Sequence, residues 1–283
     1  MQPYSLGNKS MHKLARLAAL TLMITLAIPA AARRLTSGEE VVQKVHLYVQ
    51  ARDCASAVAR LTEGLAQNYP EVNMLAGAMF ENGVCVKPDW DRAVGFYSNA
   101  FDGGQTAAMY SLMTGFAAPE HGPDMAAALW WANRPNNEFT SKGCNVSAAN
   151  RGDPDRFVEE LRAWPQRQIA LCNYLIGVMG TMIGEMRYPT KAARFGLVGT
   201  LKVCFEPAVP RIDIKTEETR EAAIGGWVDG NVMEDRKSRD VKGSFEASMR
   251  QIADRALKRY PQPAGIAPDM VIEMPLRFGV TYK

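Results

Sequence analysis

Cysteine is the residue type in this sequence whose number and spacing could do chemistry. Five are present, and no two lie close enough for the Cys-x-x-Cys motif of thiol oxidoreductases: Cys54, Cys85, Cys144, Cys172 and Cys204. Cysteines pair as disulfides in oxidising compartments and stay reduced in the cytosol. Because the number is odd, at least one thiol stays free or bonds to another molecule. The role of the cysteines therefore depends on where the chain is located.

The other reactive residue types form no pattern that indicates an enzyme. His46 and His121 have no partners at metal-ligand spacing, and we find no glycine-rich phosphate loop, nucleophile elbow or paired catalytic carboxylates in the sequence. Met179, Met182 and Met186 carry thioethers that suit Cu(I), but their spacing is also that of one apolar helix face. We expect core packing for these methionines and no catalytic residue, cofactor or metal site. An enzyme of unrecognised type remains the alternative.

The N-terminal segment, residues 1–32, has the pattern of a secretory signal peptide. Three basic side chains precede the apolar stretch 17–28, and the alanines at 30–32 provide a cleavage signal. Only 16 uncharged residues separate the flanking arginines, fewer than the roughly 20 that a membrane-spanning helix needs. We expect a periplasmic protein that starts at Met1 or Met11 and is cleaved. An uncleaved anchor in the inner membrane is the alternative.

The charge balance argues against nucleic-acid binding. The whole chain has a net charge of +3 and a pI of about 8.6, but without residues 1–32 it carries 30 basic and 30 acidic side chains. A domain that binds nucleic acid would carry a clustered basic surplus. We therefore expect a protein or peptide partner in the cell envelope, no nucleic acid, and contact with the membrane only through an uncleaved N-terminal segment.

A repeat of 34 to 36 residues indicates stacked helical hairpins in the first half of the chain. The letters DCASAVARL and DWDRAVGFY align with Ala57 on Ala93, 36 residues apart. RAVGFYSNA and AAALWWANR align with Ala93 on Ala127, 34 residues apart. Recurring alanines let neighbouring helices approach closely, and the aromatic pairs behind them fill the space between layers.

These positions resemble the Sel-one-like repeat family, a relative of the tetratricopeptide repeats. The resemblance covers about residues 45–135 and is clearest at Ala76, Phe80, Gly83, Val84, Asp89, Ala93, Phe96, Tyr97 and Ala100. It implies that residues 33–135 form an α-solenoid whose concave surface binds a protein or peptide. The alternative is a scaffold that positions the domain that follows.

Stacked hairpins would also explain the cysteine positions. Cys54 begins the helix before the repeat and Cys85 lies in the turn of the next hairpin, so stacking brings the two together. A disulfide there would stabilise the thin array by roughly 3–4 kcal/mol in the chain-entropy model. Cys144 and Cys172 are the second expected pair, which would tie a polar loop to the helix that follows it.

Between the two parts of the chain, residues 136–187 are expected to be a linker and a helical connecting segment. Its loop is rich in Asn, Gly and Pro, and its apolar spacing predicts a helix over 157–175 that Pro165 interrupts.

Residues 188–283 combine strands with one main helix. Alternating apolar side chains predict the strands, and an apolar stripe predicts the helix: strands 197–206, 211–215 and 272–280, and helix 245–260. The charged segment 216–242 is expected to be an insertion. The predicted fold class is therefore mixed (α+β), with an N-terminal α-solenoid and a small C-terminal α+β domain that has an antiparallel sheet and one main helix.

The last 95 residues or so resemble the C-terminal domain of TonB-family energy transducers. The matching residues are Tyr188, Pro189 and Ala192, the strand from Gly199 to Phe205, Tyr260 and Pro261, and the stretch from Pro275 to Phe278. The insertion 216–242 and the lack of a proline-rich linker depart from that family. The resemblance implies an outer-membrane receptor as a partner. A membrane-anchored energy transducer is thus the alternative to a periplasmic interaction protein.

Cys204 is expected to be the free thiol. Strand alternation places it with Thr200, Lys202 and Glu206 on the polar face, opposite the apolar side chains of the same strand. Coverage of this face by 216–242 would bury the thiol and is the alternative.

The last strand is expected to be a partner-binding edge strand. A proline cannot donate a hydrogen bond to a neighbouring strand, so its strand belongs at a sheet edge or a bulge. An extended peptide could pair with the free edge by β-augmentation. The residues expected to form the site are Ile272, Glu273, Pro275, Arg277 and Phe278. The same charged residues and proline could instead protect the edge from pairing.

Overall fold

A computed structural model describes residues 34–134, 141–188, 197–221 and 236–278. The chain divides into two compact units, 1–36 and 37–283. In the first, only residues 34–36 are described and they form no helix or strand. The expected signal peptide, 1–32, lies outside the described residues.

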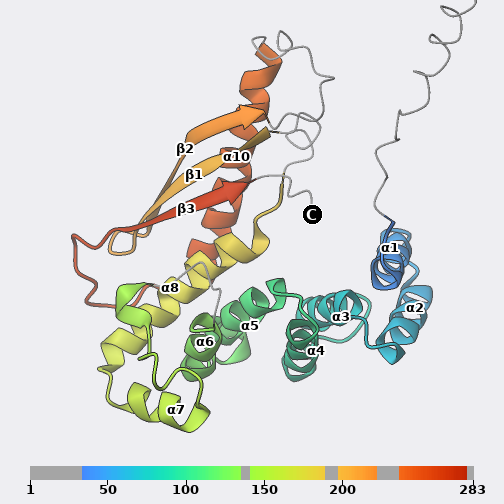
Figure 1. Ribbon diagram of the computed structural model, residues 1–283, viewed down its shortest axis with the longest axis horizontal. Helices are drawn as coiled ribbons and strands as arrows, with labels where there is room; N and C mark the ends of the chain where they lie inside the picture. Colours follow the sequence, from blue (N-terminus) through green and yellow to red (C-terminus); the bar gives the residue numbers. More distant parts are fainter. Residues whose placement is uncertain (1–33, 135–140, 189–196, 222–235, 279–283) are drawn as a thin grey trace, which may run out of the picture. The chain divides into compact units, whose positions relative to one another are not determined.

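The described part of the second unit contains nine α-helices and a three-stranded antiparallel sheet (Figure 1). The helices are α1 (Ser37–Gln50), α2 (Cys54–Ala66), α3 (Pro70–Asn82), α4 (Trp90–Asp102), α5 (Ala107–Ala117), α6 (Met125–Ala132), α7 (Pro154–Arg162), α8 (Gln166–Glu185) and α10 (Arg236–Arg259). Two short 3-10 helices are η1 (Pro119–His121) and η2 (Lys142–Cys144), and the strands are β1 (Leu197–Glu206), β2 (Arg211–Glu221) and β3 (Ile272–Phe278). The mixed α and β composition expected from the sequence is confirmed.

The first six helices form three consecutive pairs, and the second helix of each pair begins in the same way. The second helix of each pair is N-capped by an aspartate whose carboxylate accepts the N–H three residues later, at 2.9–3.0 Å. The residue four positions after each cap is a buried alanine. The caps are Asp53, Asp89 and Asp124, and the alanines are Ala57, Ala93 and Ala128.

These caps correct the second offset of the repeat. The sequence alignment placed Ala127 on Ala93, but Asp124 corresponds to Asp89, so Ala128 is the equivalent buried residue. The alignment was wrong by one residue because 125–132 is nearly all apolar. In a helix without a polar face, the sequence does not show which residues face the core. Whether the three pairs form a solenoid stays a prediction.

Between residues 154 and 185 the structure has two helices. The interruption predicted at Pro165 is confirmed, since α7 ends at Arg162 and α8 begins after Pro165, but the predicted bounds 157–175 are too short at both ends. Pro165 lies at the N-cap of α8, where its missing N–H costs no helical hydrogen bond. Within α8, Met179 and Met182 are fully buried, as expected of core residues.

The segment expected to connect two domains contributes to the largest apolar cluster of the described residues. Helix α8 is buried over much of its length and packs against α5 and α10. Its side chains share one apolar cluster with the sheet. A second cluster lies among α1, α2 and α3, and a third lies mainly among α3, α4 and α5. The domain boundaries drawn from the sequence stay a prediction.

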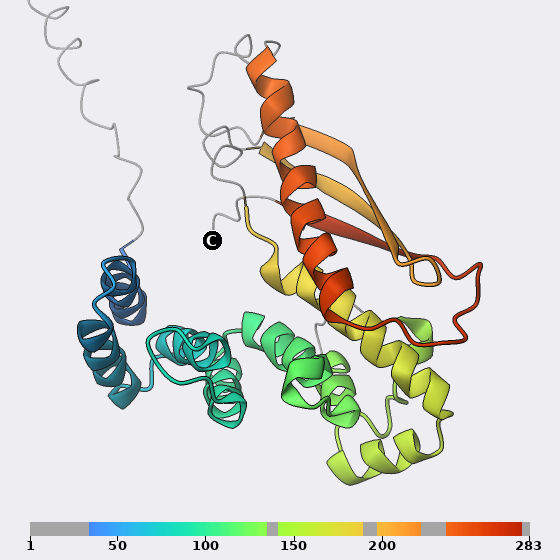
Figure 2. The ribbon, with the colours of Figure 1, turned by 180° about the vertical axis from the view of Figure 1, so that it is seen from behind.

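The sheet has the order β2-β1-β3, and α10 covers one of its faces (Figure 2). Both β2 and α10 are longer than predicted. β2 continues to Glu221 and α10 begins at Arg236, so much of the expected insertion 216–242 is regular structure. The end of β2 could not be predicted from the sequence, because 216–221 is polar and carries no apolar alternation. Residues 222–235 lie outside the described residues.

Candidate partner-binding site

The predicted edge strand is an outer strand of the sheet. β3 pairs with β1 on one side, and no strand of the described residues pairs with its other side. Its alternation places one set of side chains against the core and another set in solvent. Met274, Leu276 and Phe278 are buried, Ile272 is half-buried, and Glu273, Pro275 and Arg277 are exposed.

The buried face of β3 is held by the main helix. The ring of Phe278 stacks on that of Phe245 in α10, and Met274 and Leu276 join the same apolar cluster. The strand is therefore anchored by its inward face, while its outward face and its outer edge are left for other contacts.

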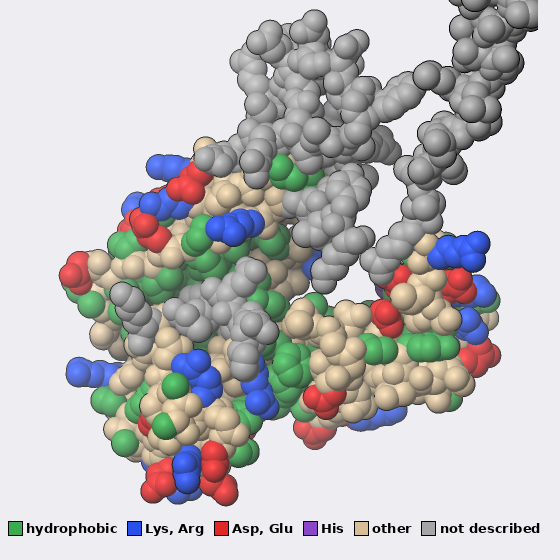
Figure 3. Space-filling view, viewed as in Figure 1, with side chains coloured by type: hydrophobic (Ala, Val, Ile, Leu, Met, Phe, Trp, Pro, Cys, Tyr) green, Lys and Arg blue, Asp and Glu red, His purple; other side chains and the backbone are tan. Residues whose placement is uncertain are grey.

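The outward face of the sheet carries charges of both signs among apolar side chains (Figure 3). Lys202 Nζ lies 2.8 Å from Oε1 of Glu273, across the β1–β3 pair. The hydrogen bond and charge of Lys202 hold the pKa of Glu273 below its usual value. Arg277, further along β3, has no ion pair within the described residues. Within that part of the chain, its guanidinium is unpaired and is available beside the strand edge.

Cys204 lies on this same face and is the one cysteine outside a disulfide. Its side chain is half-buried, and its Sγ lies 3.8 Å from Oε1 of Glu273. Burial, followed by the charge of Glu273, raises the pKa of the Cys204 thiol above its usual value, although Lys202 opposes this. The thiol is thus kept protonated and is a weak nucleophile at neutral pH.

The other four cysteines lie at disulfide distance in the two pairs expected from the sequence. Cys54 at the start of α2 bonds to Cys85 in the α3–α4 loop, and Cys144 in η2 bonds to Cys172 in α8. Buried Asn133 supports the second pair: its Nδ2 donates to the Cys144 carbonyl at 3.1 Å, and its Oδ1 accepts from the N–H of Val146 at 3.0 Å. A single asparagine gives no sequence signal of such a role.

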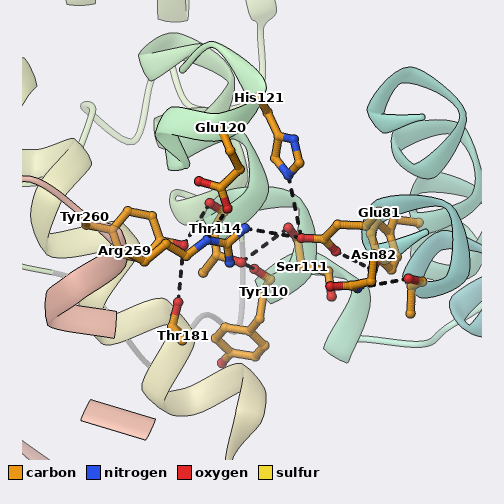
Figure 4. A network of polar contacts seen from close by, with 12 residues as sticks. Glu81, Asn82, Tyr110, Ser111, Thr114, Glu120, His121, Thr181, Arg259 and Tyr260 are labelled. Carbon is orange, nitrogen blue, oxygen red and sulfur yellow. Dashed lines mark hydrogen bonds and ion pairs between the residues drawn. The ribbon is translucent and has the colours of Figure 1, made fainter. Parts of the chain in front are cut away.

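A polar network that the sequence did not reveal joins α10 to the earlier helices (Figure 4). Arg259 Nε donates to Oε1 of Glu120 at 2.6 Å, and its Nη2 lies 3.5 Å from Oε1 of Glu81. The hydroxyl of Tyr97 donates to Oε2 of Glu81 at 2.7 Å. His121 Nε2 lies 3.9 Å from Glu81. The segments that carry these residues are too far apart in sequence for any motif to connect them.

Tyr260 continues the network into the core. Its hydroxyl donates to the carbonyl of Thr114 at 3.1 Å and accepts from Thr181 Oγ1 at 3.3 Å. Its ring lies against Gly177, where an added Cβ would come within 2.3 Å of the ring. Tyr260, one of the residues behind the TonB-family resemblance, thus fixes the end of α10 against α5 and α8.

The described residues give no sign of a metal centre or a membrane span. No three His, Cys, Asp or Glu side chains gather there in a way that could hold a metal ion. Among the helices in that part of the chain, none combines the length and apolar character that crossing a membrane requires.

Comparisons with known proteins gave no match. No family model matches the chain, and neither a curated protein nor a solved structure matches it. The resemblances to Sel-one-like repeats and to TonB-family domains therefore rest on the motif residues alone and stay predictions.

Proposed function

We propose that this chain is an exported interaction protein of the cell envelope that binds an extended segment of a protein partner along the outer edge of β3. In this proposal the helix pairs are Sel-one-like repeats and residues 188–283 form a TonB-family-like domain. The observation that carries it is the position of β3: an outer strand, anchored by its apolar face and unpaired on its other side within the described residues.

The export half of the proposal is supported by the cysteines. Two pairs lie at disulfide distance, and such pairs persist in oxidising compartments rather than in the cytosol. The secretory pattern of residues 1–32 supports the same location, and the periplasm is the compartment that we propose.

The binding half of the proposal distinguishes between the two outer strands. On β2, the N–H and hydroxyl of Thr216 both donate to Oε1 of Glu246 in α10, at 2.8 Å, so that strand is partly occupied by a side chain of the same protein. No side chain of the described residues bonds in this way to the backbone of β3. An incoming strand would gain backbone hydrogen bonds at β3, and Arg277 would select a carboxylate on it.

Pro275 reduces the number of backbone hydrogen bonds that β3 can offer a partner strand, but it does not prevent pairing. A proline supplies no N–H, so the partner strand would gain one donor fewer along β3. The same residue disfavours indiscriminate pairing between copies of the sheet edge. Selective binding would then depend on side-chain contacts with Glu273 and Arg277 on the outward face.

Hydrogen exchange with a selected peptide tests the proposal. Extended dodecapeptides are selected from a phage-displayed library against the mature chain, and amide exchange is measured with the tightest one. We expect slower exchange in 272–278 and unchanged exchange in 211–221. Arg277→Glu should weaken the peptide about tenfold, as the loss of one charged hydrogen bond does, whereas Arg211→Glu on β2 should not. Protection confined to β2, or selected peptides that leave β3 unprotected, would overturn the proposal.

A further inference from the structure

A cavity of about 510 Å³ lies between α2 and the loop that joins α3 to α4. This volume is within the range of about 300–1,000 Å³ that ligand sites occupy. Apolar and charged side chains from α2, the end of α3, the loop and the start of α4 line it. The apolar lining consists of Val58, Leu61, Leu65, Phe80, Val86 and Pro88. We call this cavity the α2 groove.

The wall of the α2 groove opposite α2 is held in place by three local constraints. The disulfide between Cys54 and Cys85 ties the α3–α4 loop to the first residue of α2. The N–H of Asp89 donates to the carbonyl of Phe80 at 2.9 Å and closes the base of the loop. Gly83, with a φ of 67°, makes the left-handed turn that ends α3. The groove is therefore preformed, which lowers the entropic cost of binding.

Two of the side chains that line the α2 groove are cations, Lys87 and Arg92. The guanidinium of Arg92 lies over the ring of Phe80, 4.0 Å from its centroid. Neither Arg92 nor Lys87 forms an ion pair within the described residues. The nearby carboxylate of Asp89 already accepts the N–H of Arg92 as the cap of α4. Lys87, Arg92 and Asp89 together give the lining a net charge of +1. Within the described residues, the guanidinium N–H groups of Arg92 form no hydrogen bond.

We infer that the α2 groove binds a short acidic segment of a protein partner. An apolar side chain of that segment enters the cavity between α2 and the loop, and a neighbouring carboxylate pairs with Arg92. A planar guanidinium can hold a carboxylate through two parallel hydrogen bonds while its face stays on the aromatic ring. A nucleic acid is a poor occupant, because the chain after residue 32 has as many acidic as basic side chains. The inference is independent of the proposed site at β3.

Three synthetic hexapeptides test the chemistry of the occupant. The first is Asp-Glu-Leu-Leu-Glu-Asp, the second replaces its acidic residues with Lys and Arg, and the third replaces its leucines with Ser. Each is labelled with fluorescein and titrated with the mature chain in an anisotropy assay. Saturable binding of the first alone, weakened by added salt, is expected. No saturation by the first peptide up to about 1 mM, or equal binding of the basic peptide, would overturn the inference.

Variants of Arg92 locate the site. Arg92→Gln should weaken the acidic peptide about tenfold, because one charged hydrogen-bonded pair is lost. Arg92→Lys should retain part of the affinity, since the charge remains but the paired hydrogen bonds do not. Arg162→Gln is the matched control: it removes one exposed arginine from α7, outside the groove. Equal affinities of the Arg92→Gln and Arg162→Gln variants would overturn the assignment.

The disulfide gives a second, independent readout. If the groove depends on the position of the α3–α4 loop, the double variant Cys54→Ser, Cys85→Ser should bind the acidic peptide more weakly while its far-UV circular dichroism is unchanged. Arg277→Glu should leave this peptide unaffected, which separates a failure of the α2 groove from a failure of β3. Unchanged affinity in a folded double variant would contradict the role of the loop. Loss of peptide binding in a folded Arg162→Gln variant would contradict the location of the site.

Discussion

Arg259 in the last turn of α10 donates its Nε hydrogen to Oε1 of Glu120 at 2.6 Å, across 139 residues of sequence. The same guanidinium lies 3.5 Å from Glu81 at the end of α3. The arginine is about three-quarters buried, with 27% of its side chain exposed. A cation at a helix C-terminus also interacts favourably with the helix dipole. This one side chain therefore connects the C-terminal helix to two earlier parts of the chain.

Replacing Arg259 should destabilise the protein. Arg259→Gln leaves Glu81, whose side chain is 14% exposed, without its guanidinium partner, and we expect the free energy of unfolding to fall by about 1–3 kcal/mol. Arg255→Gln, one turn earlier, breaks an exposed ion pair with Glu185 and should cost less than about 1 kcal/mol. Urea unfolding measures both changes. Equal losses in the two variants would show that the buried contact adds nothing.

The ion pair between Glu120 and Arg259 predicts that the stability of the protein depends on pH. Burial alone would raise the pKa of Glu120, but its backbone hydrogen bond and the charge of Arg259 outweigh burial and leave the pKa below its usual value. A lowered folded-state pKa contributes stability that is present above the unfolded pKa, roughly 4.3, and is lost as the pH falls through the folded value.

Unfolding measured between neutral pH and about pH 3 checks this sign. Glu120→Gln should show a smaller loss of stability over that window than the unmodified chain, because the variant has no carboxylate to protonate. Glu159→Gln removes an exposed carboxylate from α7 that forms no ion pair within the described residues, and it serves as the control. A Glu120→Gln variant whose pH profile follows that of the control would contradict the prediction.

Two glycines should respond in opposite ways to alanine. Gly115 in α5 faces Trp90, and a Cβ added there would lie 2.0 Å from the indole ring. Gly115→Ala should therefore cost about 1–3 kcal/mol through overpacking. Gly95 in α4 has no atom within 4 Å of an added Cβ, so Gly95→Ala should stabilise the helix by up to about 1 kcal/mol. Thermal unfolding gives the sign of each change, and a lower Tm for Gly95→Ala would contradict this account.

The sequence predicted those features that local patterns encode. Alternation of apolar side chains located β1 and β3, and the positions of the cysteines gave both pairs now found at disulfide distance. The break at Pro165 was recognised, but the helices on either side were misplaced by several residues, because α8 is apolar on most faces and has little periodicity.

The missed features depend on contacts between distant residues. The Arg259 network joins three segments that no motif relates, and the α2 groove depends on a loop that folds over a helix some 30 residues earlier in the chain. The polar half of β2 has no apolar alternation, so only its pairing with β1 identifies it as strand. The outer position of β3 was predictable because a proline within an alternating pattern indicates an outer strand.

Cys204 provides the last prediction. Its half-buried thiol lies beside Glu273, and burial together with that carboxylate raises the pKa of the thiol, so little thiolate forms at neutral pH. We expect native maleimide labelling to modify Cys204 alone, slowly near pH 7 and faster as the pH rises. Glu273→Gln should speed the reaction near pH 7, because removing a negative charge favours the thiolate. Glu206→Gln, two residues away on the same strand face, is the matched control and should leave the rate unchanged. Labelling of any other cysteine in the native protein, or equal rates in both variants, would contradict the assignment of Cys204 as a free thiol controlled by Glu273.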